Sequence, residues 1–201
     1  WGLPKGFADF LTRLRVNGCP QYCCMVATCG DDCGLAAKQW REVMEAKGMT
    51  ADAAYSVQMP NTYVIFPGFD VDKPEEEQRK LTAAPQAVGI LCRRIEAMEK
   101  GDFTHHGSVA WLKSRIIYPW FMRHVDDTPF ATTDACVGCG RCAAACPTAN
   151  ITITCRHPQW HGDCLNCLAC YHACPHHAVT FGRRTRGNGQ YTCPDNKSTS
   201  K

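Results

Sequence analysis

The first hundred residues carry hydrophobic positions in patterns that alternate between helix and strand. Residues 7–16 place four apolar side chains at helical spacing, namely Phe7, Phe10, Leu11 and Leu14, and Asn17-Gly18 predicts the end of this helix. Residues 22–28 are almost continuously apolar, which is typical of a buried parallel strand. A second strand is predicted at 53–59.

Further helices are predicted between and after these strands. A glycine-framed turn at 28–34 leads into a helix that ends at Gly48 and has an apolar side made of Leu35, Ala36, Trp40, Val43 and Met44. Lys73-Pro74 and the acids after it predict the start of another helix, which we expect to break at Pro85. A last apolar stripe runs up to Gly101 through Val88, Leu91, Cys92, Ile95 and Met98.

The order of these elements predicts an α/β domain with parallel strands over residues 1–101. Two strands are too few for a doubly wound sheet, so we expect only the C-terminal portion of such a domain. Residues 102–130 are expected to form a helical connector that is interrupted at Pro119. Its histidines lack neighbouring cysteines or carboxylates at metal spacing and are expected in solvated or capping roles: His105, His106 and His124.

Residues 131–201 contain an internal repeat. A shift of residues 136–153 by 28 positions aligns four cysteines and places Pro147 on Pro175. The same shift aligns two short segments, 151–153 and 179–181, in which apolar and polar residues alternate as in half-buried strands. The repeat predicts a pseudo-twofold domain in which each half contributes a loop, a helical turn and a strand.

Composition places the chain among globular proteins. It has 201 residues, of which 45% are hydrophobic and 20% charged, so it can bury a core and is not a disordered tail. No apolar run approaches the roughly 20 residues of a membrane helix, and no basic-then-apolar leader is present. We therefore expect a soluble, cytoplasmic protein. The chain opens on Trp1 rather than Met, which leaves its natural N-terminus open.

The sixteen cysteines carry the candidate chemistry. Three uses compete: the disulfide framework of a secreted protein, zinc sites, or iron–sulfur clusters. Residues 136–147 and 164–175 both read C-x₂-C-x₂-C-x₃-C-P, the spacing of bacterial two-cluster ferredoxins. Zinc sites need no third cysteine in step, and disulfides between cysteines three residues apart in a tight loop would be strained. The spacing therefore favours two 4Fe–4S clusters.

The motif also predicts which cysteines hold which cluster, because three cysteines of one motif bind one cluster and the fourth binds the other. Cluster one would take Cys136, Cys139, Cys142 and Cys174. Cluster two would take Cys164, Cys167, Cys170 and Cys146. With these positions filled, we expect Cys155 and Cys193 to act as small buried apolar side chains.

Charge is distributed unevenly, with a formal +4 on residues 131–201 and −1 on residues 1–130. A basic region can indicate nucleic-acid binding, and Arg183, Arg184 and Arg186 form a candidate patch. Two oxidised clusters with four thiolates each would carry about −2 apiece and nearly cancel that charge. We therefore expect redox partner proteins rather than nucleic acid.

The chain resembles the EFR-family ferredoxins, bacterial proteins that fuse a flavodoxin-like domain to a C-terminal two-cluster ferredoxin. Besides the two cysteine motifs, the resemblance rests on Trp1-Gly2-Leu3-Pro4, the turn from Thr28-Cys29-Gly30 to Gly34, Met59-Pro60-Asn61-Thr62-Tyr63, Asn150-Ile151, Pro158-Gln159-Trp160 and Gly189-Gln190-Tyr191. It implies a partial flavodoxin-like domain at 1–101 and a ferredoxin-like domain with two 4Fe–4S clusters at 131–201.

The resemblance further implies that FMN exchanges electrons with the clusters. Thr28, Gly30 and Asp31 would then match a flavin-edge loop, with Trp1 near another. The strand and loop that hold the flavin phosphate would precede Trp1, so FMN is expected only where that segment is present.

The main hypothesis is an iron–sulfur electron carrier or electron-transfer module. Two alternatives stay open: a flavin-dependent oxidoreductase subunit, for which no acid–base constellation is visible, and a structural metal-binding module that docks to a partner.

Overall fold

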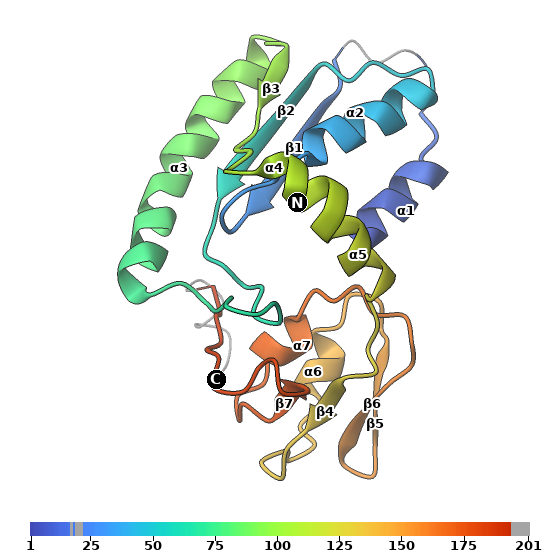
Figure 1. Ribbon diagram of the computed structural model, residues 1–201, viewed down its shortest axis with the longest axis vertical. Helices are drawn as coiled ribbons and strands as arrows, with labels where there is room; N and C mark the ends of the chain where they lie inside the picture. The colour runs from blue at the N-terminus through green and yellow to red at the C-terminus, as the bar shows by residue number, and fades with distance from the viewer. Residues whose placement is uncertain (17, 19–21, 194–201) are drawn as a thin grey trace. The chain divides into compact units, whose positions relative to one another are not determined.

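The computed structural model describes residues 1–16, 18 and 22–193 (Figure 1). Contacts divide the chain into two compact units, the first made of Trp1–Pro60 and Lys73–His124, the second of Asn61–Asp72 and Val125–Lys201. The domain boundaries at residues 101 and 130 stay predictions. In the described part of the chain, no helix is both long enough and apolar enough to cross a membrane.

The first unit is a three-stranded parallel sheet with helices packed around it (Figure 1). Its strands, in sheet order, are β1 (Cys24–Cys29), β2 (Ala53–Gln58) and β3 (Gly101–Phe103). Its helices are α1 (Lys5–Arg13), α2 (Ala36–Ala46), α3 (Pro74–Glu96), α4 (Ala110–Leu112) and α5 (Tyr118–Arg123), with a π-helical segment, Lys113–Ile117, between the last two.

The core of this unit lies between α2 and one face of the sheet. Trp40 and Met44 stand four residues apart on α2, so both point to the same side, and both are buried. They pack with Met25 and Ala54, which face each other across the β1–β2 register. The predicted helix and both predicted strands are therefore confirmed. The stop predicted at Asn17 lies outside the described residues.

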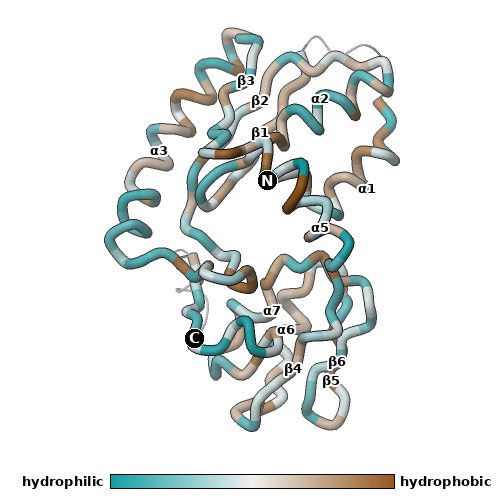
Figure 2. Tube along the Cα trace, in the orientation of Figure 1, coloured by the Kyte–Doolittle hydropathy of each residue, from teal (hydrophilic) through white to brown (hydrophobic). Residues whose placement is uncertain are grey.

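The predicted break of α3 at Pro85 is wrong. The helix runs without interruption from Pro74 to Glu96. Pro85 is exposed, so water can satisfy the backbone carbonyl that its missing N–H leaves free. Three acids in the first turn, Glu75, Glu76 and Glu77, match the positive end of the helix dipole, and Figure 2 shows this end as hydrophilic.

Two expectations about the sheet are also corrected. A third parallel strand, β3, follows α3, where the sequence indicated only a helix stop and a connector. It has three residues, too few for a readable period. Burial of β1 is one-sided, because Val26 is 51% exposed while Met25 is buried. The unit is thus a parallel α/β structure, and its flavodoxin-like class stays a prediction.

The predicted interruption of the connector helix at Pro119 is wrong, because helical backbone runs from Ala110 to Arg123 without a break and the residues just before Pro119, Lys113–Ile117, form a π-helical turn. Pro119 closely follows this π-helical turn, so its missing N–H coincides with the change from π-helical to α-helical hydrogen bonding. Within the π segment the buried Ser114 hydroxyl donates to the Trp1 carbonyl at 2.5 Å and accepts from the Leu35 N–H at 2.9 Å.

The second unit contains two antiparallel pairs of strands and two short helices (Figure 1). In chain order its elements are β4 (Phe130–Thr132), α6 (Arg141–Ala144), β5 (Ile151–Thr154), β6 (His157–Trp160), α7 (Ala169–His172) and β7 (Val179–Phe181). β4 pairs with β7 and β5 pairs with β6. A shift of 28 residues carries β4 to β6, α6 to α7 and β5 to β7, so each pair joins one strand from each repeat. The predicted strands at 151–153 and 179–181 are confirmed.

The segment 61–72 belongs to the core of this second unit. Val64 and Ile65 are almost fully buried in one cluster with Phe130 and Phe181. Their backbone is held by Asn188, whose amide donates to the Val64 carbonyl at 2.7 Å.

Candidate metal centre

Both cysteine loops have the same backbone path. At equivalent positions 28 residues apart, three pairs have positive φ angles: Gly138 (69°) and Asn166 (54°), Gly140 (79°) and Leu168 (60°), Ala149 (52°) and His177 (50°). Only glycine adopts this region without cost, so four non-glycine residues held there indicate that the surrounding loop imposes the shape. The repeat in the sequence is therefore also a repeat in backbone conformation.

One set of four predicted ligands lines a single cavity, which we call cavity one. Cys136, Cys139 and Cys142 of the first motif and Cys174 of the second all line this one space. Its other walls include Val137, Ile153, Pro158 and Val179, together with the charged or titratable Arg141 and His176.

The other four predicted ligands line an equivalent space, cavity two. Cys164, Cys167 and Cys170 of the second motif and Cys146 of the first all line this space. The walls here are mostly apolar and aromatic and include Phe130, Pro147, Ile151, Trp160, Leu165 and Leu168. In each cavity, three cysteines thus come from one motif and the fourth from the other.

Backbone N–H groups point at several of these sulfurs. The N–H of Asn150 donates to Cys146 Sγ at 3.3 Å, and at the equivalent position the N–H of Ala178 donates to Cys174 Sγ at 3.3 Å. The N–H of Asn166 donates to Cys164 Sγ at 3.2 Å. Such donors stabilise negative charge on sulfur, as a bound thiolate requires.

Burial works against free thiolates in these cavities. It raises the pKa of the Cys142 and Cys164 thiols and raises the pKa of Cys170 to about 12. Deprotonation of such thiols needs a bound cation or cluster, which couples ligand binding to proton release.

Trp160 is a residue that the sequence did not single out for this site. Its ring stacks on Phe130 at 5.5 Å between centroids, and its Nε1 is buried without a hydrogen-bond partner among the described residues. A donor left unpaired in a cysteine-lined wall fits a site that holds a sulfur-rich anionic group. In the sequence, Trp160 was notable only as part of Pro158-Gln159-Trp160, one of the segments on which the family resemblance rests.

A buried network of hydrogen bonds fixes the turn that precedes the second cysteine motif. Asn150, 3% exposed, donates to Asp127 Oδ2 at 2.7 Å and accepts from the N–H of His161 at 3.1 Å and of Asp163 at 2.7 Å. Asp127 also accepts from the N–H of Gly162 at 2.7 Å. The network holds the turn before Cys164 against the residues that follow Cys146.

The other predicted residues lie elsewhere. Thr28 is exposed near the end of β1, Gly30 follows the strand, and the Asp31 carboxylate lies 3.6 Å from Lys80 Nζ on α3. The expectation of a buried role for Cys155 is wrong, because it is exposed in the turn between β5 and β6. His106 and His124 contact the backbone carbonyls of Gly34 and Trp120 at 2.8 and 2.6 Å.

The structure also bears on the two alternative uses of cysteine, disulfides and sites for a single zinc ion. The fifteen described cysteines are all free thiols. Within residues 1–16, 18 and 22–193, no three His, Cys, Asp or Glu side chains come together as they would around a single metal ion.

Comparison with known proteins identifies one segment. The family model of a 4Fe-4S binding domain, Fer4, matches residues 131–152, which contain α6 and the four cysteines of the first motif. No curated protein and no solved structure matches the chain. The protein therefore contains a 4Fe–4S binding domain, which points to iron–sulfur electron transfer.

Proposed function

We propose that the protein is an electron carrier with two 4Fe–4S clusters, one in each cysteine-lined cavity. The observation that carries the proposal is the exchange of the fourth cysteine between motifs. Cys174 joins the first motif in cavity one, and Cys146 joins the second motif in cavity two. Each bound cluster would accept and release one electron.

The residues of this chain would hold and tune those clusters. Four thiolates per cavity bind iron, while the N–H groups of Asn150, Asn166 and Ala178 stabilise charge on the sulfurs. The buried Leu168 and Val179, which line cavity two and cavity one respectively, exclude water from the thiolates. Because the two ligand sets are interlocked, the cavities share one small fold, a suitable arrangement for an electron relay.

The test is a metal and sulfide analysis of protein purified without oxygen, with a visible spectrum before and after dithionite. We expect about eight irons and eight sulfides per chain and a broad absorbance that bleaches on reduction. A colourless protein that holds zinc after anaerobic reconstitution would contradict the proposal and leave the structural metal module.

Coupling to FMN is a finer proposal. Parallel strands bring the loops after their carboxyl ends to one edge of a sheet, where nucleotides commonly bind. Thr28, Gly30 and Asp31 lie at that edge of β1, and the Asp31 carbonyl accepts from the Gln58 amide at the end of β2 (2.8 Å). Titration with FMN should shift the flavin spectrum, and Gly30→Val should weaken that shift. An unchanged spectrum would contradict flavin binding by this chain.

A further inference from the structure

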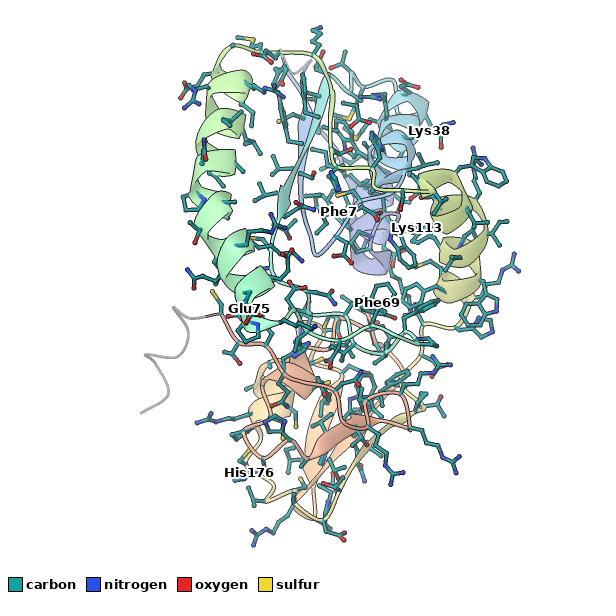
Figure 3. All side chains as sticks on the ribbon, turned by 60° about the vertical axis from the view of Figure 1, so that its left-hand side comes forward. Phe7, Lys38, Phe69, Glu75, Lys113 and His176 are labelled. Carbon is teal, nitrogen blue, oxygen red and sulfur yellow. The ribbon has the colours of Figure 1, made fainter. Side chains whose placement is uncertain are left out.

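A cavity that uses no cysteine of either cluster motif opens at the carboxyl edge of the first unit's sheet. Its volume is about 280 Å³. Ser56 and Gln58 line it from the end of β2, and Thr104 and His105 line it from the residues directly after β3. Parallel sheets commonly bind ligands at this edge. Another wall comes from one side of α3, namely Arg79, Lys80, Ala83, Ala84 and Ala87 (Glu75, at the start of this helix, is labelled in Figure 3).

Hydrogen bonds between neighbouring segments hold the walls of this cavity. The N–H of His105 donates to Ser56 Oγ at 2.8 Å and so joins the segment after β3 to β2. The His105 carbonyl accepts from the N–H of Cys33 at 2.9 Å, and the Gln58 amide donates to the Asp31 carbonyl at 2.8 Å. The loops after all three strands are thus tied together, so a ligand finds the cavity already formed and pays little ordering entropy.

The titratable side chains that line the cavity are all basic: Arg79, Lys80 and His105. Lys80 is only 2% exposed, and its Nζ lies 3.6 Å from an Asp31 carboxylate oxygen and 3.8 Å from one of Glu76. Those two carboxylates are 64% and 40% exposed, and among the described residues no acid lines the cavity. A buried ammonium whose acidic partners face solvent leaves the interior of the cavity electropositive.

We propose that this cavity binds a small organic phosphate ester. The Lys80 ammonium and the Arg79 guanidinium donate charge-assisted hydrogen bonds to the phosphate oxygens. Arg79 is oriented for this by Glu76, which accepts from its Nε at 2.8 Å and its Nη2 at 2.6 Å. The apolar part of the ester lies along Ala83 and Ala87, which stand one helical turn apart and leave room through their small side chains.

The charge of the lining favours a phosphate ester over a carboxylate. A phosphate monoester carries about −1.5 to −2 near neutral pH, whereas a carboxylate carries a single negative charge. The larger charge gains more from the basic lining. The described lining includes none of the predicted cluster ligands and neither Thr28 nor Gly30 of the proposed flavin edge, so the site stands apart from both proposals above.

The test is calorimetric titration of the whole protein, prepared without oxygen in phosphate-free buffer, with phenyl phosphate, inorganic phosphate and benzoate in turn. We expect saturable binding of one phenyl phosphate per chain. Inorganic phosphate should bind more weakly because it lacks the apolar part, and benzoate because it carries less charge. No saturable binding of phenyl phosphate would overturn the proposal. Benzoate that binds as tightly as phenyl phosphate would contradict the choice of a phosphate ester.

Substitution of Lys80 places the binding in this cavity. Lys80→Met keeps an apolar stem of similar length, and the exposed Asp31 and Glu76 are not left as buried unpaired charges, so the fold should hold. Loss of a charge-assisted hydrogen bond should weaken phenyl phosphate binding about tenfold or more. Arg93→Gln is the matched control, because Arg93 is exposed on the same helix and does not line the cavity. Its affinity should be unchanged.

A second variant tests the apolar end and leaves every charge in place. Ala87→Leu fills the space along α3, so it should weaken binding of phenyl phosphate while inorganic phosphate binds as before. Unchanged phenyl phosphate affinity in both Lys80→Met and Ala87→Leu would place the ligand elsewhere and overturn the proposal.

Discussion

Cavity one and cavity two have the same repeated backbone but different walls. Arg141 and His176 line cavity one, and both are exposed (His176 is labelled in Figure 3). The aromatic rings of Phe130 and Trp160 line cavity two instead. The repeat therefore reproduces the positions of the cysteines, while side chains that are not repeated set the charge and polarity around each set.

This difference has a consequence for the proposed electron transfer. A nearby positive charge favours the reduced cluster, which is the more negative state, so we expect the higher reduction potential in cavity one. The exposed Val137 and Ile153 also line cavity one and offer an apolar surface beside Arg141. We therefore expect electrons to leave toward a partner from cavity one rather than from cavity two.

The largest effect should come from removal of one ligand in each cavity. Cys139 and Cys167 occupy equivalent positions and are both exposed, so Cys139→Ala and Cys167→Ala differ only in the cavity that they open. Each should reduce the iron content from about eight to about four per chain, with loss of one of two reduction steps. Cys155→Ala is the control, and an iron loss no greater than in that control would contradict the ligand assignment.

A smaller effect is expected from the glycines that shape cavity one. A Cβ at Gly138 would lie 2.6 Å from the Arg156 carbonyl oxygen at a φ of +69°, so Gly138→Ala should destabilise the loaded second unit by about 3 kcal/mol. Gly140 also has positive φ, but its nearest neighbour would be 3.9 Å away, so Gly140→Ala should cost only about 1 kcal/mol. Urea unfolding followed by visible absorbance measures both. Equal costs would show that the close approach at Gly138 is relieved by movement.

A substitution at Asn150, which lines cavity two, should affect that cavity and not cavity one. Its equivalent in the second repeat is Ala178, so the network with Asp127 exists only once. Asn150→Ala leaves the N–H groups of His161 and Asp163 without this acceptor, which should cost about 2 kcal/mol. The same urea experiment should show cluster loss at lower denaturant. An unchanged midpoint would mean that water replaces the amide without penalty.

The smallest effect should be electronic. Trp160→Phe keeps a ring against Phe130 but removes the buried N–H near Cys170. A hydrogen bond from this N–H to the proposed bound cluster, worth about 1 kcal/mol, would correspond to about 40 mV for one electron, and its loss should lower the potential of the cavity-two cluster only. An EPR-monitored titration resolves the two steps. The reduction step that remains in Cys167→Ala, which should lack the cavity-two cluster, belongs to cavity one. A shift of that step in Trp160→Phe would contradict the placement of Trp160 beside cavity two.

Much of the fold was readable because its signals are local. The helical spacing of Trp40 and Met44 in α2 and the alternation around Ile151 and Val179 each depend on neighbours along the chain. Pro85 misled the prediction because a proline breaks a helix only where its lost hydrogen bond cannot be replaced, and exposure is a tertiary property. Strand β3 was not predicted for a related reason, since its three residues form a strand only when β2 lies beside them.

By itself, the sequence predicted the cysteine ligands and their grouping into two sets of four, because the spacing of cysteines along a loop limits which sulfurs can reach one centre. It did not determine the walls of the cavities. Phe130 and Trp160 are 30 residues apart and become one aromatic wall only when β5 pairs with β6 and β4 with β7. The same holds for Asn150 and Asp127, whose contact depends on two turns meeting in the core. Spacing acts through chain connectivity, whereas charge, burial and hydrogen bonding at the sulfurs depend on residues that only tertiary packing brings together.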